Sequence, residues 1–126
     1  MTPSSAEVLL VEGDILVRHP LAEYLRACGF VVYEASNGDE ARQHLSCPSS
    51  KIELVLADTT TQGSGFELRH WISTQKLDVE VVLASSVEKA VDSAGQLCKE
   101  GPAQATPWDH RLVLETIRQA IARRSR

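Results

Sequence analysis

Short apolar runs alternate with amphipathic segments along almost the whole chain. The runs are rich in Val, Ile and Leu and end at turn-forming residues, which is the pattern of strands buried in a parallel sheet. The segments between them carry apolar residues at the three- and four-residue spacing of helices. The predicted strands are Val8–Val11, Phe30–Ala35, Ile52–Asp58, Val79–Ala84 and a weak fifth, Ala103–Ala105. The predicted helices are Ile15–Cys28, Asp39–Leu45, Phe66–Thr74, Val87–Cys98 and His110–Ala122.

Four positions add detail to these helices. Pro20 removes a backbone donor inside the first helix, so we expect a kink or a later start there. Gly29 follows that helix in the position of a C-terminal cap. Phe66 and Leu112 belong to the apolar stripes of later helices, and we expect both in the core.

The order of elements predicts the fold class. Five β-then-α units of this length indicate an α/β protein, with a doubly wound five-stranded parallel sheet and helices on both faces. A chain of 126 residues forms one domain. We expect this domain to span residues 6–122, with flexible termini at 1–5 and 123–126.

Polar side chains gather where the predicted strands end. Glu12 and Asp14 follow the first strand, Asp58 ends the third, Ser85 follows the fourth and Thr106 follows the fifth. The carboxyl ends of parallel strands share one edge of a sheet, and ligands bind at that edge. A strand-end aspartate can also simply cap the next helix. The convergence of several acidic groups favours a site, and oxygen ligands of this kind suit Mg²⁺.

Composition and charge exclude several other classes. The formal net charge of −4 gives no reason to expect nucleic acid as a partner. No apolar stretch approaches the ~20 residues that span a bilayer, and the N-terminus lacks the pattern of a signal peptide, so a cytoplasmic protein without membrane contact is expected. The basic residues near the C-terminus suit a helix end or a frayed tail. They are Arg118, Arg123, Arg124 and Arg126.

The three cysteines are odd in number and widely spaced. Cys28, Cys47 and Cys98 show none of the pairings typical of metal sites. In a cytoplasmic protein this pattern predicts reduced, partly buried thiols.

The chain resembles the receiver domain of bacterial two-component response regulators, over about residues 6–122. That resemblance implies a flavodoxin-like, CheY-like fold and a signalling module rather than an enzyme, with at most self-phosphorylation from a phosphodonor and slow autodephosphorylation. It depends on four motifs in this order and spacing: Val8–Asp14 (VLLVEGD), Leu21–Gly29 (LAEYLRACG), Glu34–Gly38 (EASNG) and Leu54–Asp58 (LVLAD).

The resemblance implies a role for each matching position. Asp58 matches the aspartate that accepts the phosphoryl group, and Glu12 matches the first residue of the acidic pair that serves the metal. Thr60 matches the position whose backbone carbonyl binds the metal. Ser85 matches the switch hydroxyl that bonds the phosphoryl group, and Thr106, before a proline, falls where the family has a lysine.

This sequence also departs from the family pattern in its pocket. The second acidic position is Gly13, although Asp14 follows at once and is a candidate ligand. Thr106 supplies no cation, and the switch aromatic has no counterpart in Ala103–Ala105. Fewer charges around the phosphoryl group weaken both Mg²⁺ binding and phosphoryl transfer. The resemblance therefore implies a degenerate pocket with a weakened Mg²⁺ site made of Glu12, Asp14, Asp58 and Thr60.

Two functions of this fold remain open at this point. In the first, a histidine kinase or phosphotransfer protein phosphorylates Asp58, and phosphorylation changes the binding of a downstream protein or of a missing output domain. A homodimer is also compatible with this function. In the second, a pseudo-receiver binds or dimerises without phosphorylation. An aspartate-nucleophile phosphatase is disfavoured because Thr60 replaces its second acid. A dinucleotide site is disfavoured because no glycine fingerprint follows the first strand.

Overall fold

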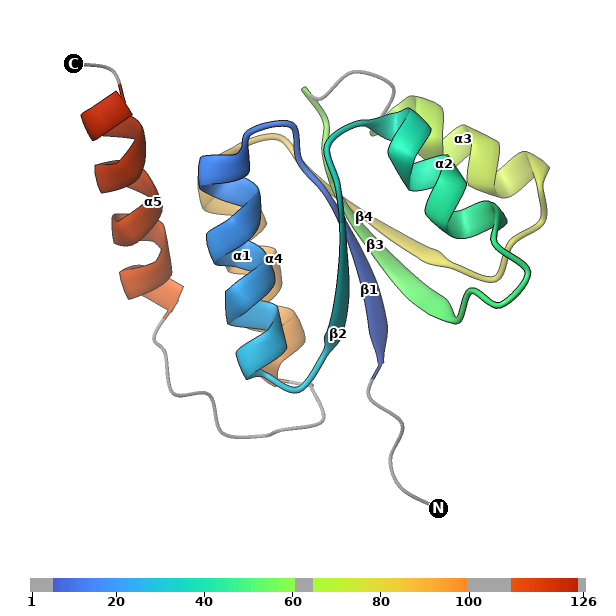
Figure 1. Ribbon diagram of the computed structural model, residues 1–126, viewed down its shortest axis with the longest axis horizontal. Helices are drawn as coiled ribbons and strands as arrows, with labels where there is room; N and C mark the ends of the chain where they lie inside the picture. The colour runs from blue at the N-terminus through green and yellow to red at the C-terminus, as the bar shows by residue number, and fades with distance from the viewer. Residues whose placement is uncertain (1–5, 61–64, 100–109, 125–126) are drawn as a thin grey trace.

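The computed structural model describes residues 6–60, 65–99 and 110–124, and it shows one sheet with helices on both faces (Figure 1). The described strands are β1 (Glu7–Val11), β2 (Val31–Ala35), β3 (Ile52–Asp58) and β4 (Glu80–Ala84). The described helices are α1 (Ile15–Ala27), α2 (Gly38–Ser46), α3 (Phe66–Thr74), α4 (Val87–Lys99) and α5 (His110–Arg124).

The sheet is parallel and has the strand order β2-β1-β3-β4 within the described residues. This confirms the predicted α/β class with a parallel sheet. The predicted fifth strand, residues 103–105, lies outside the described part of the chain. After β1 the chain forms β2 on one side and β3 on the other, so the topological switch point lies between β1 and β3. In open α/β sheets, ligands bind at the carboxyl ends of the strands beside such a point.

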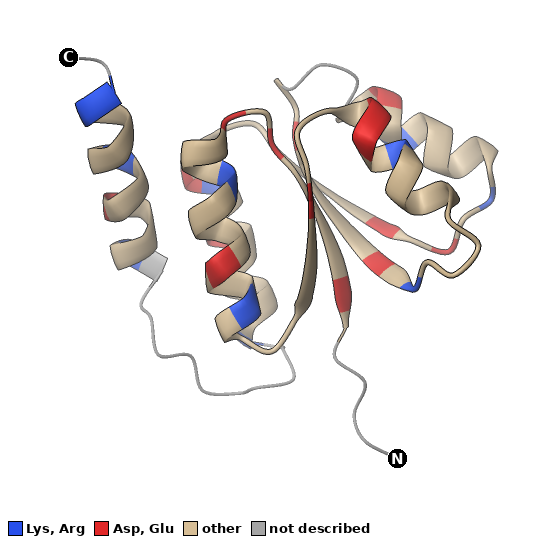
Figure 2. Ribbon diagram, viewed as in Figure 1, with Lys and Arg blue, Asp and Glu red and all other residues tan. Residues whose placement is uncertain are grey.

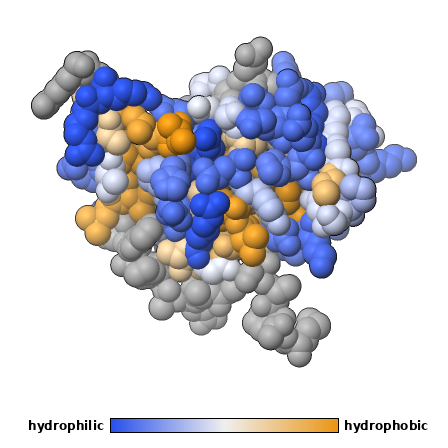
Figure 3. Space-filling view, in the orientation of Figure 1, coloured by the Kyte–Doolittle hydropathy of each residue, from blue (hydrophilic) through white to orange (hydrophobic). Residues whose placement is uncertain are grey.

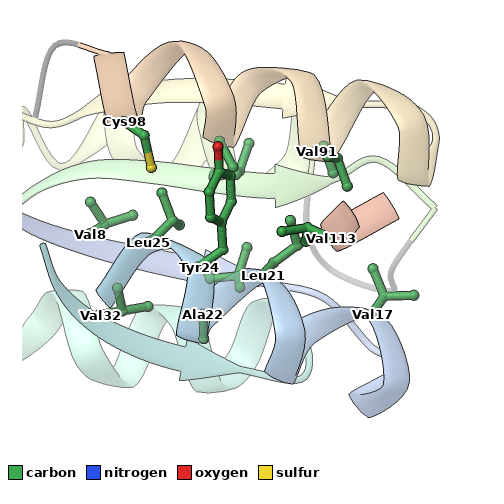
Figure 4. Packing of buried hydrophobic residues seen from close by; sticks show 14 of the residues in the cluster. Val8, Val17, Leu21, Ala22, Tyr24, Leu25, Val32, Val91, Cys98 and Val113 are labelled. Atoms are coloured by element: carbon green, nitrogen blue, oxygen red, sulfur yellow. The ribbon is translucent and has the colours of Figure 1, made fainter. Parts of the chain in front are cut away.

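Two apolar cores cover the two faces of the sheet. On one face, α1, α4 and α5 pack over residues such as Val8 (Figure 4), Leu10 and Leu56. On the other face, α2 and α3 pack over Leu9 and Val55. Neighbouring residues of β1 therefore point into opposite cores, which explains why its sequence is apolar at every position after Glu7. Helices on both faces, as predicted, leave little of the central strands in contact with water.

Local signals set the ends of the helices. The side chains of Asp14 and Asn37 accept hydrogen bonds from Leu16 N–H and Glu40 N–H, which caps the starts of α1 and α2. Gly29 has a φ of 95°, which permits the turn after α1. The helix begins at Ile15 despite Pro20, so the expectation of a later start is wrong. None of the described helices combines the length and hydropathy needed to cross a bilayer.

Two residues expected in the core are exposed. The exposed fractions of Phe66 and Leu112 are 71% and 64%. In α5 the buried residues are Val113 and Ile117, which lie four positions apart on one helix face, so the helix turns Leu112 outwards. Figure 3 shows apolar residues at the surface on the side of α1 and α5, whereas hydrophilic residues predominate over α2 and α3.

The prediction of reduced thiols is wrong for two of the three cysteines. Cys28 and Cys98 form a disulfide, with their Cα atoms 5.3 Å apart. It joins the end of α1 to α4 inside the core, and both residues are buried. Cys47 is a free thiol but is exposed rather than partly buried. No local pattern signals this pairing, because the two cysteines are 70 residues apart and meet only through helix packing.

We expect reduction of this disulfide to destabilise the fold, because a cross-link over a long loop restricts the unfolded chain. Urea denaturation with and without dithiothreitol should give a free energy of unfolding that is about 2–4 kcal/mol lower in the reduced protein. The variant Cys47→Ser should respond to dithiothreitol in the same way as the wild type. Equal stability of the oxidised and reduced wild type would contradict a stabilising bond.

Candidate active site

A pocket of about 190 Å³ lies at the carboxyl ends of β1, β3 and β4. It is lined by all five of the predicted site residues that the structure describes. These are Glu12, Asp14, Asp58, Thr60 and Ser85. Thr106 lies outside the described residues. This volume is large enough for several water molecules or a small anion.

Asp58 is the last residue of β3 and is half-buried. Thr60 donates to both of its carboxylate oxygens, from Oγ1 to Oδ2 at 2.6 Å and from the backbone N–H to Oδ1 at 3.3 Å. The Thr59 N–H donates to the Ala84 carbonyl at 3.0 Å, which continues the pairing of β3 with β4 past the strand end. The carboxylate is therefore held at the mouth of the pocket by the chain that follows it.

Glu12 is the buried acid of the pocket, with an exposed fraction of 9%. Burial, a hydrogen bond with Asp58 and the negative charge of Asp58 together raise the pKa of Glu12 from 4.5 to about 8. At neutral pH the Glu12 carboxyl group is therefore mostly protonated and donates to Asp58. The two carboxyl groups then share a single negative charge.

Asp14 has a different environment, although it lines the same pocket. Its Oδ1 accepts from the Leu16 N–H at 3.0 Å and from Arg124 Nη1 at 2.9 Å. The hydrogen bond with Arg124 is the main reason that the pKa of Asp14 lies below its ordinary value. Sequence reasoning missed this partner, because 110 residues separate the pair and only helix packing joins them.

Arg18 was also missed, and it supports the loop that carries Glu12. Its Nη1 donates to the Glu12 carbonyl at 2.9 Å, and its Nε lies 3.2 Å from Glu34 Oε1. Nothing in the sequence indicates that an arginine in the first turns of α1 would bond the end of β1. Arg18 thereby connects β1, β2 and α1 behind the pocket.

The remaining wall of the pocket is formed by the loop between β4 and α4. Ser85 is exposed and lines the pocket, and Ser86 begins α4 by accepting from the Lys89 N–H at 3.1 Å. Next to the strand end that carries Asp58, Gly65 has a φ of 67°, and a Cβ there would lie 3.1 Å from Thr59 Cα. Glycine thus permits the close approach between the start of α3 and the end of β3.

Curated proteins resemble part of the chain in sequence, and no family model matches it. It is 30% identical over 82 residues to a cyclic di-GMP phosphodiesterase of Thermotoga maritima. It is 32% identical over 83 residues to the two-component response regulator-like protein PRR37 of rice, Oryza sativa subsp. indica. Each match covers 64% of this chain, but only 21% of the first relative and 11% of the second.

Solved receiver structures match over nearly the whole chain. A response regulator receiver protein of Pseudomonas putida is 26% identical, with a TM-score of 0.56 over 92% of this chain and 98% of that chain. The chain has the receiver-domain fold of response regulators. A receiver domain protein of Clostridium thermocellum shares this fold, with a TM-score of 0.59, 20% identity and coverage of 95% and 97%.

A third receiver structure that matches includes a partner. It contains the Saccharomyces cerevisiae histidine phosphotransfer protein Ypd1 and the receiver domain of Ssk1. Its TM-score is 0.54 at 20% identity, over 72% of this chain and 74% of that chain.

Mg²⁺ is the cofactor that the receiver resemblance implies, and the pocket offers it a reduced set of ligands. Among the described residues, no group of three or more His, Cys, Asp or Glu side chains could hold a metal. Glu12 and Asp58 do lie together, while the Asp14 carboxylate is engaged by Arg124. Mg²⁺ in proteins is often held by one or two carboxylates and several waters. Glu12 and Asp58 are therefore the two carboxyl groups that would hold the ion, together with waters, once Glu12 has released its proton.

The raised pKa of Glu12 predicts a pH dependence of stability in metal-free buffer. Between its unfolded value of 4.5 and about 8, the folded state binds more protons at Glu12 than the unfolded state does, so stability falls as pH rises through this window. Glu12→Gln keeps a neutral donor and removes the titration. Above pH 8 we expect the variant to gain up to roughly 4 kcal/mol over the wild type, relative to their difference at pH 4.5.

This dependence is measured by urea denaturation of both proteins across the window, with EDTA present. Groups that do not interact with Glu12 contribute equally to both proteins and cancel in the difference, so the difference reports the titration of Glu12 together with its bonded neighbour Asp58. A difference that does not change with pH would contradict a protonated Glu12 in the folded state.

Proposed function

We propose that this protein is a phosphorelay receiver that accepts a phosphoryl group on Asp58 from a histidine kinase or a phosphotransfer protein. The observation that supports this most directly is the position of Asp58. It ends a central strand beside the switch point, opens to a pocket, and is surrounded there by Glu12, Thr60 and Ser85. The similarity to solved receiver domains agrees with this role.

The chemistry is a transfer between two nucleophiles. A carboxylate oxygen of Asp58 attacks the phosphorus of the partner's phosphohistidine, an O–P bond forms, and the N–P bond breaks. The leaving imidazole nitrogen takes the electron pair and binds a proton. No other residue needs to form a covalent bond. The rate therefore depends on how the reacting groups are positioned and on how the charge of the phosphoryl oxygens is stabilised.

The neighbours of Asp58 have distinct parts in this proposal. Thr60 holds the carboxylate by its two hydrogen bonds, and its backbone carbonyl is a candidate ligand for Mg²⁺. Ser85 supplies a hydroxyl donor for the phosphoryl oxygens, and Thr106 is proposed as a second. When bound, Mg²⁺ would be held by Glu12 and Asp58 and would neutralise charge on the phosphoryl oxygens.

The readout of phosphorylation is proposed to be a change in partner affinity. Ser85 directly precedes the residue that caps α4, so a new bond from Ser85 to a phosphoryl group would shift the start of that helix. We propose that the domain runs from residue 6 to the end of α5 at Arg124, two residues past the predicted limit of 122. We also propose that it lies in the cytoplasm, with a downstream protein, an output domain or a second copy as the responding partner. One similar receiver structure was solved with a histidine phosphotransfer protein, which supports that class of donor.

A phosphorylation-independent pseudo-receiver is the second candidate. The observation in its favour is that, among the described residues, no three His, Cys, Asp or Glu side chains are grouped so that they could hold a metal ion. Such a protein would use the same surface to bind a partner or to dimerise constitutively.

Intact-mass spectrometry after incubation with Mg²⁺ and acetyl phosphate tests the receiver proposal. We expect the wild type to gain the mass of one phosphoryl group. Asp58→Asn should gain none, because an amide is not a nucleophile for this transfer, and the wild type in EDTA should gain none.

A matched control is Asp39→Asn, which removes an exposed carboxylate on α2, away from the pocket. It should be phosphorylated like the wild type. No adduct on the wild type at millimolar Mg²⁺ would favour the pseudo-receiver. An adduct that persists in Asp58→Asn would show that another residue is the acceptor.

A further inference from the structure

The C-terminal end of α5 lies at the same end of the molecule as the loop after β1, which lines the pocket (Figure 1). Two observations place it there. Ile121 lines the pocket together with Asp14 and Asp58, and Arg124 Nη1 lies 2.9 Å from Asp14 Oδ1. Figure 2 shows the basic end of α5 and the acidic loop after β1 at this same end. A helix distant in sequence thus brings a cation to the acidic corner.

Arg124 bonds a pocket carboxylate that would otherwise be available to a cation. Glu12 is buried and bonded to Asp58, whereas the Asp14 side chain is 27% exposed and charged. A metal ion at the pocket would gain from this charge, but a guanidinium already binds it. Two cations that require the same carboxylate compete, and each weakens the binding of the other by the same factor.

We propose that Arg124 masks Asp14 from Mg²⁺, so that the end of α5 sets the affinity of the pocket for the ion. This inference deepens the proposed receiver function and rests on its metal site. It assigns a role to a residue outside the receiver motifs, and it means that Asp14 becomes a ligand only when α5 releases it.

The expected size of the effect follows from the exposure of the pair. The Arg124 side chain is 53% exposed, and ion pairs of this kind contribute about 0.2–1 kcal/mol. Removing the competitor should therefore tighten Mg²⁺ binding by roughly 1.4- to fivefold. The gain should shrink as salt is added, because salt screens partly exposed charges.

Isothermal titration calorimetry with Mg²⁺ at low ionic strength tests this directly. Arg124→Gln should lower the Kd by the stated factor. Arg123→Gln removes the same charge from the neighbouring position and should leave the Kd unchanged, which separates masking from a general change in net charge. Circular dichroism would confirm that each variant is folded.

Asp14→Asn shows which carboxylate is involved, since asparagine still caps α1 but has no charge. In this background, Arg124→Gln should no longer tighten Mg²⁺ binding. An unchanged or weakened affinity in Arg124→Gln, or an equal gain in Arg123→Gln, would overturn the proposal. So would a gain that persists in the Asp14→Asn background, and so would a lack of Mg²⁺ binding in every variant.

The outcome is independent of the test of the proposed function. Masking is measured as a ratio of Mg²⁺ dissociation constants, whereas the receiver function is measured as a mass gain at Asp58. A wild type without a phosphoryl adduct whose Arg124→Gln variant binds Mg²⁺ more tightly would refute the receiver and support the mask. A phosphorylated wild type, with equal Mg²⁺ dissociation constants for the two arginine variants, would support the receiver function and overturn the masking by Arg124.

Discussion

The pairing of two carboxyl groups at the ends of neighbouring central strands is the constraint on which the site depends. In the register of β1 and β3, Val11 lies opposite Ala57, so the next residues, Glu12 and Asp58, meet at the edge of the sheet. Burial beside Asp58 keeps Glu12 mostly protonated. A protonated Glu12 donates a hydrogen bond to Asp58, whereas two charged carboxylates in contact would repel each other. The proton on Glu12 makes the pair stable without a cation. When Glu12 loses this proton, a bound cation would offset the repulsion between the two carboxylates.

The strands and helices around Glu12 and Asp58 are held together by apolar packing, and a few polar contacts fix the two carboxyl groups. Arg18 fixes the end of β1 and Thr60 fixes Asp58. Asp14 begins α1 and bonds to α5 through Arg124. Charge in the pocket is therefore balanced by groups from separate parts of the chain. The position of α5 and the electrostatics of the pocket are coupled by this ion pair.

The opposite end of the helical layer is fastened covalently. The disulfide between Cys28 and Cys98 joins the C-terminal ends of α1 and α4, whereas the pocket is formed beside their N-terminal ends. Disulfides are rare in reducing compartments. A cytoplasmic location would therefore require this buried bond to persist under reducing conditions, in addition to its effect on stability. With one end held, conformational change is expected at the other end, where Asp58 ends β3 and Ser85 lies in the exposed loop before α4.

Local patterns in the sequence were sufficient for the fold class, for the limits of β3 and α3, and for the pocket residues after β1, β3 and β4. These features depend on periodicity and on the rule that parallel strands end at the same edge of a sheet. Which side chains are partners depended on the packing of the folded chain. Nothing local predicts that Cys28 bonds Cys98 or that Arg124 reaches Asp14, because these contacts arise from the way helices pack. The orientation of α5, which buries Val113 and exposes Leu112, was predicted wrongly, since the apolar residues of this helix offer more than one face. Charge states followed the same division: the positions of Glu12 and Asp14 could be predicted, but only burial and partners made one neutral and the other charged.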